Sequence, residues 1–180
     1  MNRSLEVLIL APFSDELVAK LSNVSPRLRI KALRASHSSD VPPDDWGEAE
    51  ILYTSQVLPS PEQSPNLRWI QFHWAGVDHA IDAPILTKPD LVATTMSGAA
   101  VPQMGEYILT MLLALGHRLP DMIDHQKRAE WPQDRWKRFS PQELNRSIVG
   151  IVGYGSIGRE VARLLRAFGA TVLASKRDVM

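Results

Sequence analysis

The clearest hydrophobic pattern in the sequence lies between Ile148 and Ser175. An apolar, β-branched run from Ile148 to Val152 is typical of a buried parallel strand. Apolar residues then recur at helical spacing from Val161 to Phe168, and Gly169 suits the end of that helix. A second apolar run, Thr171 to Ala174, completes a predicted β-α-β unit.

Three glycines at the spacing G-x-G-x-x-G join the first strand of this unit to its helix. Gly153 permits a tight turn, Gly155 lets a pyrophosphate approach the backbone, and Gly158 allows the helix to pack closely on the strand. The helix N-terminus then presents free N–H groups to the phosphates. The alternative is a glycine-rich turn without a ligand. The pattern predicts a dinucleotide site made by Gly153, Tyr154, Gly155, Ser156, Ile157 and Gly158.

Short apolar runs before this unit alternate with polar and proline-marked segments, which predicts an α/β layer fold. A helix that begins after Ser14 is expected to bury Leu17, Val18 and Leu21. The predicted strands are Leu5–Ala11, Leu28–Ala35, Ile51–Thr54, Leu67–Phe72 and Leu91–Thr95, and the predicted loops cover residues 36–45 and 59–65.

The segment from Val101 to His117 predicts a helix that is apolar on nearly every side between Met104 and Leu115. Such a helix is expected to be fully buried, in a core or in a subunit interface. The polar segment 121–138 follows and places Trp131 and Trp136 among basic side chains. This combination indicates either nucleic-acid stacking or a solvated arm anchored by the two tryptophans, and the neutral net charge favours the arm.

Composition narrows the class of protein. The chain has 180 residues, 44% of them hydrophobic, and a formal net charge of zero, which gives no support for nucleic acid or a membrane surface as partner. It contains no cysteine, which excludes disulfides, cysteine metal sites and thiol nucleophiles, and no other metal site is predicted. No signal peptide or membrane-spanning run is recognised, so we expect a soluble, cytoplasmic protein.

Three blocks of sequence resemble the D-isomer-specific 2-hydroxyacid dehydrogenase family. The block Trp69–Asp78 is similar to the family's substrate loop, which ends in Gly-Val-Asp. Residues 97–107 are similar to the start of its interdomain helix, and Leu144–Arg177 is similar to its dinucleotide fingerprint. The resemblance implies an NAD(P)-dependent oxidoreductase that interconverts a 2-oxo acid and a D-2-hydroxy acid by hydride transfer.

The resemblance also implies a domain organisation. Residues 1–100 would form the N-terminal part of a flavodoxin-like substrate domain. Residues 101–180 would form the first β-α-β unit of a truncated Rossmann domain, and both domains would have parallel sheets with helices on both faces. The family's active site is the cleft between the domains. Backbone N–H groups near Ala75, Gly76 and Val77 would hold the substrate carboxylate, although Gly76 alone also suits a plain turn.

Further interpretations concern the implied substrate loop and the apolar helix. Asp78 is interpreted as a structural acceptor in the loop, and His79 as incidental. Met104 would lie near the nicotinamide end of the cofactor, or would simply fill the core. Gly105 replaces the alanine usual in the family, a change that should only loosen packing. The helix at residues 101–118 and the arm after it would form a homodimer.

Three catalytic residues of the family have no counterpart in these 180 residues. The family's arginine, acidic residue and histidine follow the second Rossmann strand, and none of the five histidines present matches the catalytic position. No catalytic residue is therefore predicted, and this chain is expected to be an inactive, truncated form of a longer enzyme. The alternatives are a non-catalytic relative that dimerises or binds a partner, and a methyltransferase, against which the substrate-loop block argues.

Cofactor choice is predicted from the residues at the end of the second strand. Dinucleotide enzymes place an acidic residue there, which accepts hydrogen bonds from the adenosine ribose. Aligned on the family pattern, Lys176 holds this position between Ser175 and Arg177. These side chains would attract a 2′-phosphate, so NADP is favoured over NAD. The alternatives are a solvated basic turn, or Asp178 acting as a displaced acid.

Overall fold

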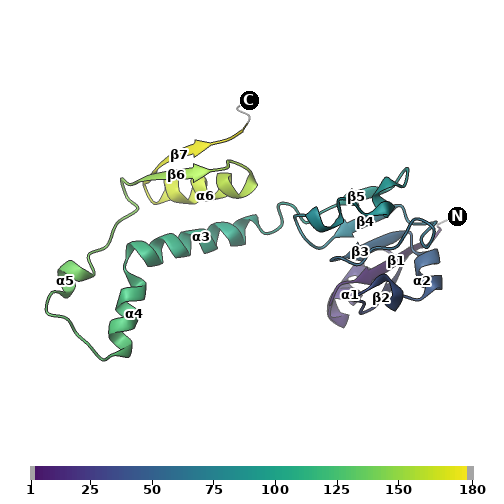
Figure 1. Ribbon diagram of the computed structural model, residues 1–180, viewed down its shortest axis with the longest axis horizontal. Helices are drawn as coiled ribbons and strands as arrows, with labels where there is room; N and C mark the ends of the chain where they lie inside the picture. The colour runs from purple at the N-terminus through teal and green to yellow at the C-terminus, as the bar shows by residue number, and fades with distance from the viewer. Residues whose placement is uncertain (1–2, 178–180) are drawn as a thin grey trace. The chain divides into compact units, whose positions relative to one another are not determined.

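The computed structural model describes residues 3–177 of the chain. Contacts divide it into two compact units, with the boundary between Ser97 and Gly98. Each unit contains a parallel sheet with helices between its strands, so the predicted α/β class is confirmed (Figure 1).

The N-terminal unit is built on a five-stranded sheet in the order β2-β1-β3-β4-β5, and every neighbouring pair of strands is parallel. All five predicted strands are present, most of them shorter than expected. The strands are β1 (Leu5–Leu10), β2 (Leu28–Ala32), β3 (Ile51–Thr54), β4 (Trp69–Phe72) and β5 (Val92–Thr94). They are joined by helices α1 (Asp15–Ser22) and α2 (Pro43–Glu48) and by the 3-10 turns η1 (Ser38–Asp40), η2 (Asp78–Ala80) and η3 (Pro84–Thr87).

The two faces of this sheet are separated by the alternation of side chains along each strand. On one face, Leu8, Leu52 and Ile70 belong to a single buried core that also includes Trp46 of α2. The residues that alternate with these along each strand point to the other face. Tyr53 is one of these, and it stands next to Gln71 of β4 in the parallel register. This face carries the side chains that reach the candidate site at the carboxyl ends of β3 and β4.

Helix α1 begins where the sequence predicts, because the Ser14 side chain accepts a hydrogen bond from the N–H of Leu17 at 3.4 Å. The prediction that this helix buries Leu17, Val18 and Leu21 is wrong. Leu17 and Leu21 are 45% and 36% exposed, and Val18 is only half-buried. The reason is that α1 packs chiefly against β2, the edge strand of the sheet, so one side of the helix has no covering surface within the described residues.

The prediction of a continuous loop at residues 36–45 is also wrong, since η1 and the start of α2 lie within it. Pro43 occupies the first turn of α2, where a missing N–H costs nothing. The helix is fixed by Trp46, which is buried and donates its indole N–H to the carbonyl oxygen of Ser38 at 3.1 Å. The adjacent prolines therefore begin a helix here instead of extending a loop.

The C-terminal unit confirms the predicted β-α-β pattern. Strands β6 and β7 pair in parallel, and α6 connects them and packs on one face of the pair. Helix α3 packs against α6, and two short helices follow α3 before the chain enters β6 (Figure 1). The helices are α3 (Val101–Gly116), α4 (Leu119–Lys127), α5 (Arg135–Arg138) and α6 (Ser156–Ala167), and the strands are β6 (Ile148–Val152) and β7 (Thr171–Ser175).

The expectation that the apolar helix is fully buried is wrong for this chain taken alone. Within α3 only Gly105 is buried, while Tyr107 and Leu115 are exposed. The side of α3 that faces α6 is partly covered, and there Ile108 and Leu112 pack against a small core around Leu165. Burial in a subunit interface therefore remains a prediction. No helix in the described part of the chain is long and apolar enough to cross a membrane.

Gly105 does more than loosen packing, which corrects the sequence-based expectation. A Cβ at this position would lie 2.9 Å from Glu160 Cγ and 3.0 Å from Leu164 Cδ1, both on α6. These separations are shorter than ordinary van der Waals contacts. The missing side chain therefore allows α3 and α6 to approach closely.

Replacing Gly105 by leucine should destabilise the C-terminal unit, because the new side chain overpacks the contact between α3 and α6. Overpacking of this kind costs about 1–3 kcal/mol. Thermal unfolding followed by circular dichroism should show a lower Tm. The matched control is Gly47→Leu, since nothing lies within 4 Å of a Cβ there. An unchanged Tm for Gly105→Leu would contradict the close approach of the two helices.

Candidate functional site

The glycine turn after β6 has the geometry that the sequence predicts. Gly153 has a φ of +94°, a left-handed conformation that residues with a side chain rarely adopt. Its N–H donates to the carbonyl oxygen of Ser175 at 3.0 Å, so the turn is held against the end of β7. Gly155 is extended and directly precedes the first residue of α6. The turn therefore joins the carboxyl ends of both strands to the helix N-terminus.

Two other glycines of this turn differ in what surrounds them. At Gly155 no atom lies within 4 Å of a hypothetical Cβ, so the backbone there is open to a ligand. At Gly158, which is buried, a Cβ would collide with the carbonyl oxygen of Gly153 and would lie 3.4 Å from Ile151 Cγ2. One glycine leaves space above the turn, and the other lets α6 pack directly on it.

The first turn of α6 presents its backbone donors without competition from side chains. It contains no acidic residue, and no side chain caps the helix. The N-terminal end of a helix carries a partial positive charge and free N–H groups, which suits a phosphate. Of the other predicted cofactor residues in the turn, Tyr154 is half-buried, whereas Ser156 and Ile157 are exposed.

The predicted cofactor-selecting residues follow β7 directly. Ser175 is the last residue of the strand, and its carbonyl oxygen is the group that accepts from the glycine turn. Lys176 and Arg177 come next and are exposed, so their charges are available to a ligand at the turn. Asp178, the alternative acid, lies outside the described residues.

Met104, the remaining predicted cofactor residue, lies in the first turns of α3 and is 37% exposed. It is therefore not a core residue of this unit, which argues against the alternative that it fills the core. Beside its neighbour Gly105, the exposed ion pair between Arg163 and Glu160 spans 2.7 Å on α6. The hydrogen bond from Arg163 lowers the pKa of the Glu160 carboxyl.

A second candidate site is the loop that leaves the carboxyl end of β4. Ala75 and Gly76 are exposed, and Val77 is half-buried against the main core. Within residues 3–177, the backbone N–H groups of these three residues donate to no other protein atom. Consecutive free donors in a loop form a concave site suited to an anion. The predicted carboxylate-binding residues are thus together and have unused donors.

Both flanks of this loop are attached to the carboxyl end of β3 by histidines. On one side, the hydroxyl of Tyr53 and Nδ1 of His73 are 2.8 Å apart, and burial raises the pKa of the tyrosine. On the other side, Nε2 of His79 is 3.1 Å from the carbonyl oxygen of Ser55. The ring of Phe13 also lies near Tyr53, with ring centroids 4.9 Å apart.

These contacts revise two interpretations of the loop. His79 is not incidental, because its ring also meets Phe72 edge to face at 6.0 Å. Asp78 accepts no hydrogen bond from another described residue, so its predicted role as a structural acceptor is not supported. The sequence carries no local signal for the histidine contacts. They follow only from the parallel register of β3 and β4, which places Tyr53 and His73 on the same face.

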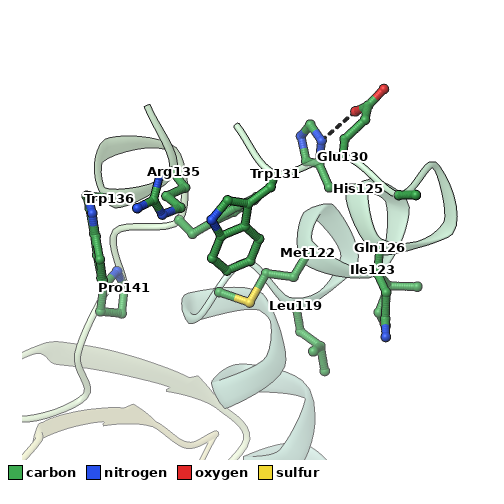
Figure 2. A pocket seen from close by; sticks show the side chains of 12 residues that line it. Leu119, Met122, Ile123, His125, Gln126, Glu130, Trp131, Arg135, Trp136 and Pro141 are labelled. Atoms are coloured by element: carbon green, nitrogen blue, oxygen red, sulfur yellow. Dashed lines mark hydrogen bonds and ion pairs between the residues drawn. The ribbon is translucent and has the colours of Figure 1, made fainter. Parts of the chain in front are cut away.

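The segment between α3 and β6 forms an arm that carries an apolar groove of about 730 Å³. Figure 2 shows Arg135 between two tryptophans, with its guanidinium carbon 5.2 Å from the ring centroid of Trp131 and 5.3 Å from that of Trp136. The two tryptophans are 77% and 81% exposed, so they do not anchor the arm as predicted. Instead, each ring stacks on a cation and leaves its other surface free. The groove is lined by Leu119, Met122, Ile123, His125, Gln126, Ala129, Glu130, Phe139 and Pro141 in addition to these three.

The wall of the groove includes a short network of charged groups. Nδ1 of His125 lies 2.7 Å from Glu130 Oε2, and the Nε of Arg128 lies 3.0 Å from the same oxygen. The hydrogen bond with His125, and next that with Arg128, lowers the pKa of the Glu130 carboxyl. No group of three or more His, Cys, Asp or Glu side chains within residues 3–177 is arranged to hold a metal ion.

Comparison with known proteins agrees with the geometry of the glycine turn. Residues 109–179 match the family model described as D-isomer specific 2-hydroxyacid dehydrogenase, NAD binding domain. A D-3-phosphoglycerate dehydrogenase of Synechocystis sp. is 32% identical over 99 residues, which cover 55% of this chain and 17% of that protein.

Two solved structures are similar to nearly the whole chain. One is a D-isomer specific 2-hydroxyacid dehydrogenase family protein from Aeromonas salmonicida, 31% identical with a TM-score of 0.76, over 97% of this chain and 54% of that one. The other is a D-lactate dehydrogenase from Aquifex aeolicus complexed with NAD and lactic acid, 26% identical with a TM-score of 0.72, over 97% and 52%. The chain therefore spans about half the length of these solved relatives. Fold, glycine turn and sequence thus agree with the D-isomer-specific 2-hydroxyacid dehydrogenase family, whose NAD binding domain model matches residues 109–179 of this chain.

Proposed function

We propose that this chain binds a nicotinamide dinucleotide at the Gly153–Gly158 turn and the carboxylate of a 2-oxo acid at Ala75–Val77. These two sites would contribute to an NAD(P)-dependent oxidoreductase that interconverts a 2-oxo acid and a D-2-hydroxy acid. The observation that carries the proposal is the division of roles among the three glycines of the turn. The ligands of the Aquifex aeolicus relative, NAD and lactic acid, support the same class of reaction. The cytoplasm remains the proposed location.

In this proposal each group of residues has a separate task. The N-terminal N–H groups of α6 bind the pyrophosphate, and the open backbone at Gly155 lets it approach. The free N–H groups of Ala75, Gly76 and Val77 bind the substrate carboxylate and so orient the 2-oxo group. The nicotinamide, when bound, supplies or accepts the hydride.

The same reaction also needs a proton donor beside the carbonyl oxygen. None of the five histidines of the chain matches the catalytic position of the family, and no other residue is assigned to this task. We therefore propose that residues 1–180 bind both ligands but do not turn them over by themselves. The alternative is a non-catalytic protein that binds a partner, a role favoured by the exposed apolar surfaces of α3 and the arm.

The proposed dinucleotide site predicts that one glycine substitution changes cofactor affinity and that another changes thermal stability. Gly155→Ala should leave Tm unchanged, because its Cβ meets no protein atom, but it should raise the Kd for NADPH about tenfold or more by obstructing the pyrophosphate. Gly158→Ala should lower Tm, since its Cβ collides with the backbone of Gly153. Fluorescence titration and thermal unfolding of the same samples measure both effects.

Three results would count against this assignment. The first is a Gly155→Ala protein that binds NADPH as tightly as the wild type. The second is an unchanged Tm for Gly158→Ala, which would mean that α6 does not rest on the turn. The third concerns catalysis: turnover of glyoxylate with NADPH by residues 1–180, at a rate ordinary for an enzyme, would contradict the proposal of binding without turnover.

The proposed preference for NADP rests on the two exposed basic residues that follow β7. Lys176→Asp and Arg177→Ala should each weaken NADPH binding, because each removes a charged contact with the 2′-phosphate worth about 1.5–3 kcal/mol. Binding of NADH, which lacks this phosphate, should change little with Arg177→Ala. Calorimetric titration of each variant with both cofactors gives the ratio of the two Kd values. Lys127→Asp, which alters an exposed basic residue of the arm, is the charge-matched control. Tighter binding of NADH by the wild type would refute the preference.

The proposed partner is a second copy of the chain, bound through α3 and the arm. Tyr107, Met111 and Leu115 are exposed on α3, and the arm adds the apolar groove that Trp131 and Trp136 help to line. Exposed apolar side chains of this kind are typical of subunit interfaces. This proposal assigns the apolar helix to an interface, which was one of the two environments expected from its sequence.

Introducing a carboxylate into this surface should prevent the dimer from forming. Leu115→Glu and Met122→Glu would each bury an unpaired charge, at a cost of several kcal/mol, which corresponds to a hundredfold or greater increase in the dimer Kd. Light scattering after size exclusion measures the change in mass. Leu17→Glu is the control, because Leu17 is an exposed leucine of similar character on the other unit. A wild-type monomer, or a dimer that survives both substitutions, would disprove the interface.

A further inference from the structure

The loop Trp74–Asp78 has a histidine on each side, and both histidines are attached to the carboxyl end of β3. His73 reaches the side chain of Tyr53, and His79 reaches the backbone of Ser55. A backbone hydrogen bond adds to the attachment of His73, whose N–H donates to the carbonyl oxygen of Thr54 at 2.8 Å. Between these points the loop has few bonds of its own, since its three central N–H groups donate to no described protein atom.

The first attachment lies in an aromatic environment that fixes the imidazole ring. The ring of His73 meets Tyr53 at 5.8 Å, Phe13 at 6.4 Å and Trp74 at 5.1 Å between centroids, in each case edge to face. Its polar contact in this surround is the tyrosine hydroxyl. The tyrosine hydroxyl and Nδ1 share one hydrogen bond, which holds the imidazole ring in one orientation.

The second attachment has a different donor. The carbonyl oxygen of Ser55 can only accept, so Nε2 of His79 must carry the proton that it shares. The ring of His79 also packs edge to face on Phe72, a core residue of β4. The His79 side chain thus connects the far end of the loop both to β3 and to the main core.

We propose that His73 and His79 are positioning residues that hold the N–H groups of Ala75, Gly76 and Val77 ready for the substrate carboxylate. This inference rests on the proposed function of the loop and adds the residues that keep its donors ordered. Without the two attachments the loop must lose conformational freedom when the anion binds, and that loss weakens binding. Neither histidine touches the substrate in this proposal.

Paired substitutions separate this role from simple packing. His73→Asn retains a polar atom near the position of Nδ1, and His79→Gln retains an N–H donor near the position of Nε2. His73→Leu and His79→Leu fill similar volume but have no polar atom. Tyr53→Phe removes only the hydroxyl from the first attachment. His37→Leu is the control, because His37 is an exposed histidine of the same unit, far along the chain from the loop.

The probe is oxamate, a stable analogue of a 2-oxo acid, titrated into ¹⁵N-labelled residues 1–180. Amide shifts of Ala75, Gly76 and Val77 report binding to the loop. The leucine variants and Tyr53→Phe should raise the Kd for oxamate roughly three- to tenfold, the size expected for one net hydrogen bond. The Asn and Gln variants should recover most of this loss. The Kd for NADPH, measured in the same samples, should not change, because the glycine turn belongs to the other unit.

Each outcome has a definite meaning. Oxamate affinity that is unchanged in both leucine variants and in Tyr53→Phe overturns the positioning role while leaving the carboxylate site intact. Equal losses in the leucine variants and in their Asn or Gln counterparts also overturn it, because packing alone would then explain the effect. If the wild type shows no oxamate-dependent shifts at Ala75–Val77, the proposed carboxylate site is wrong and the inference falls with it. Should a leucine variant fail to fold, Tyr53→Phe and the Asn and Gln variants still decide the question.

Discussion

Helix α6 can rest on the glycine turn only because position 158 has no side chain, and the rest of the C-terminal unit depends on that contact. The carbonyl oxygen of Gly153 occupies the space that a Cβ would need. With α6 held in this position, its free N–H groups lie at the ends of β6 and β7, and its opposite side is available to α3. One steric requirement therefore orders the turn, the anion-binding end of the helix and the packing of the next helix.

Much of this arrangement is predictable because its signals are local. The strand from Ile148 to Val152, the glycine spacing and the apolar face of α6 all occur within one short stretch, and each agrees with the next. Burial is less predictable, because it depends on surfaces that lie far away in sequence or on another molecule. The apolar residues of α1 recur at helical spacing and α3 is apolar on nearly every side, yet Leu17 and Leu115 are exposed since no described residue covers them. The exposure of Trp131 and Trp136 was also not predicted, although the residue they stack on, Arg135, is close to both in sequence.

The candidate site also contains both parts that local sequence predicts and parts that depend on residues distant in sequence. The roles of Gly153, Gly155 and Gly158 could be predicted individually, because each follows from the backbone geometry of a single turn. The contacts of His73 and His79 could not, because their partners, Tyr53 on β3 and Ser55 just after it, are 20 and 24 residues away in sequence. Such pairs become visible only when strand order and register are known, since a shift of one residue would move a side chain to the other face of the sheet.

The narrow space at Gly105 also constrains how relatives of this chain can diverge. A methyl group at that position would meet the stem of Glu160 and the tip of Leu164, both flexible side chains on α6. Alanine at 105 therefore becomes acceptable when both neighbours shorten or bend away, and it then brings its greater helix propensity. Positions 105, 160 and 164 are expected to co-vary among homologues, although more than 50 residues separate the first from the other two in this sequence.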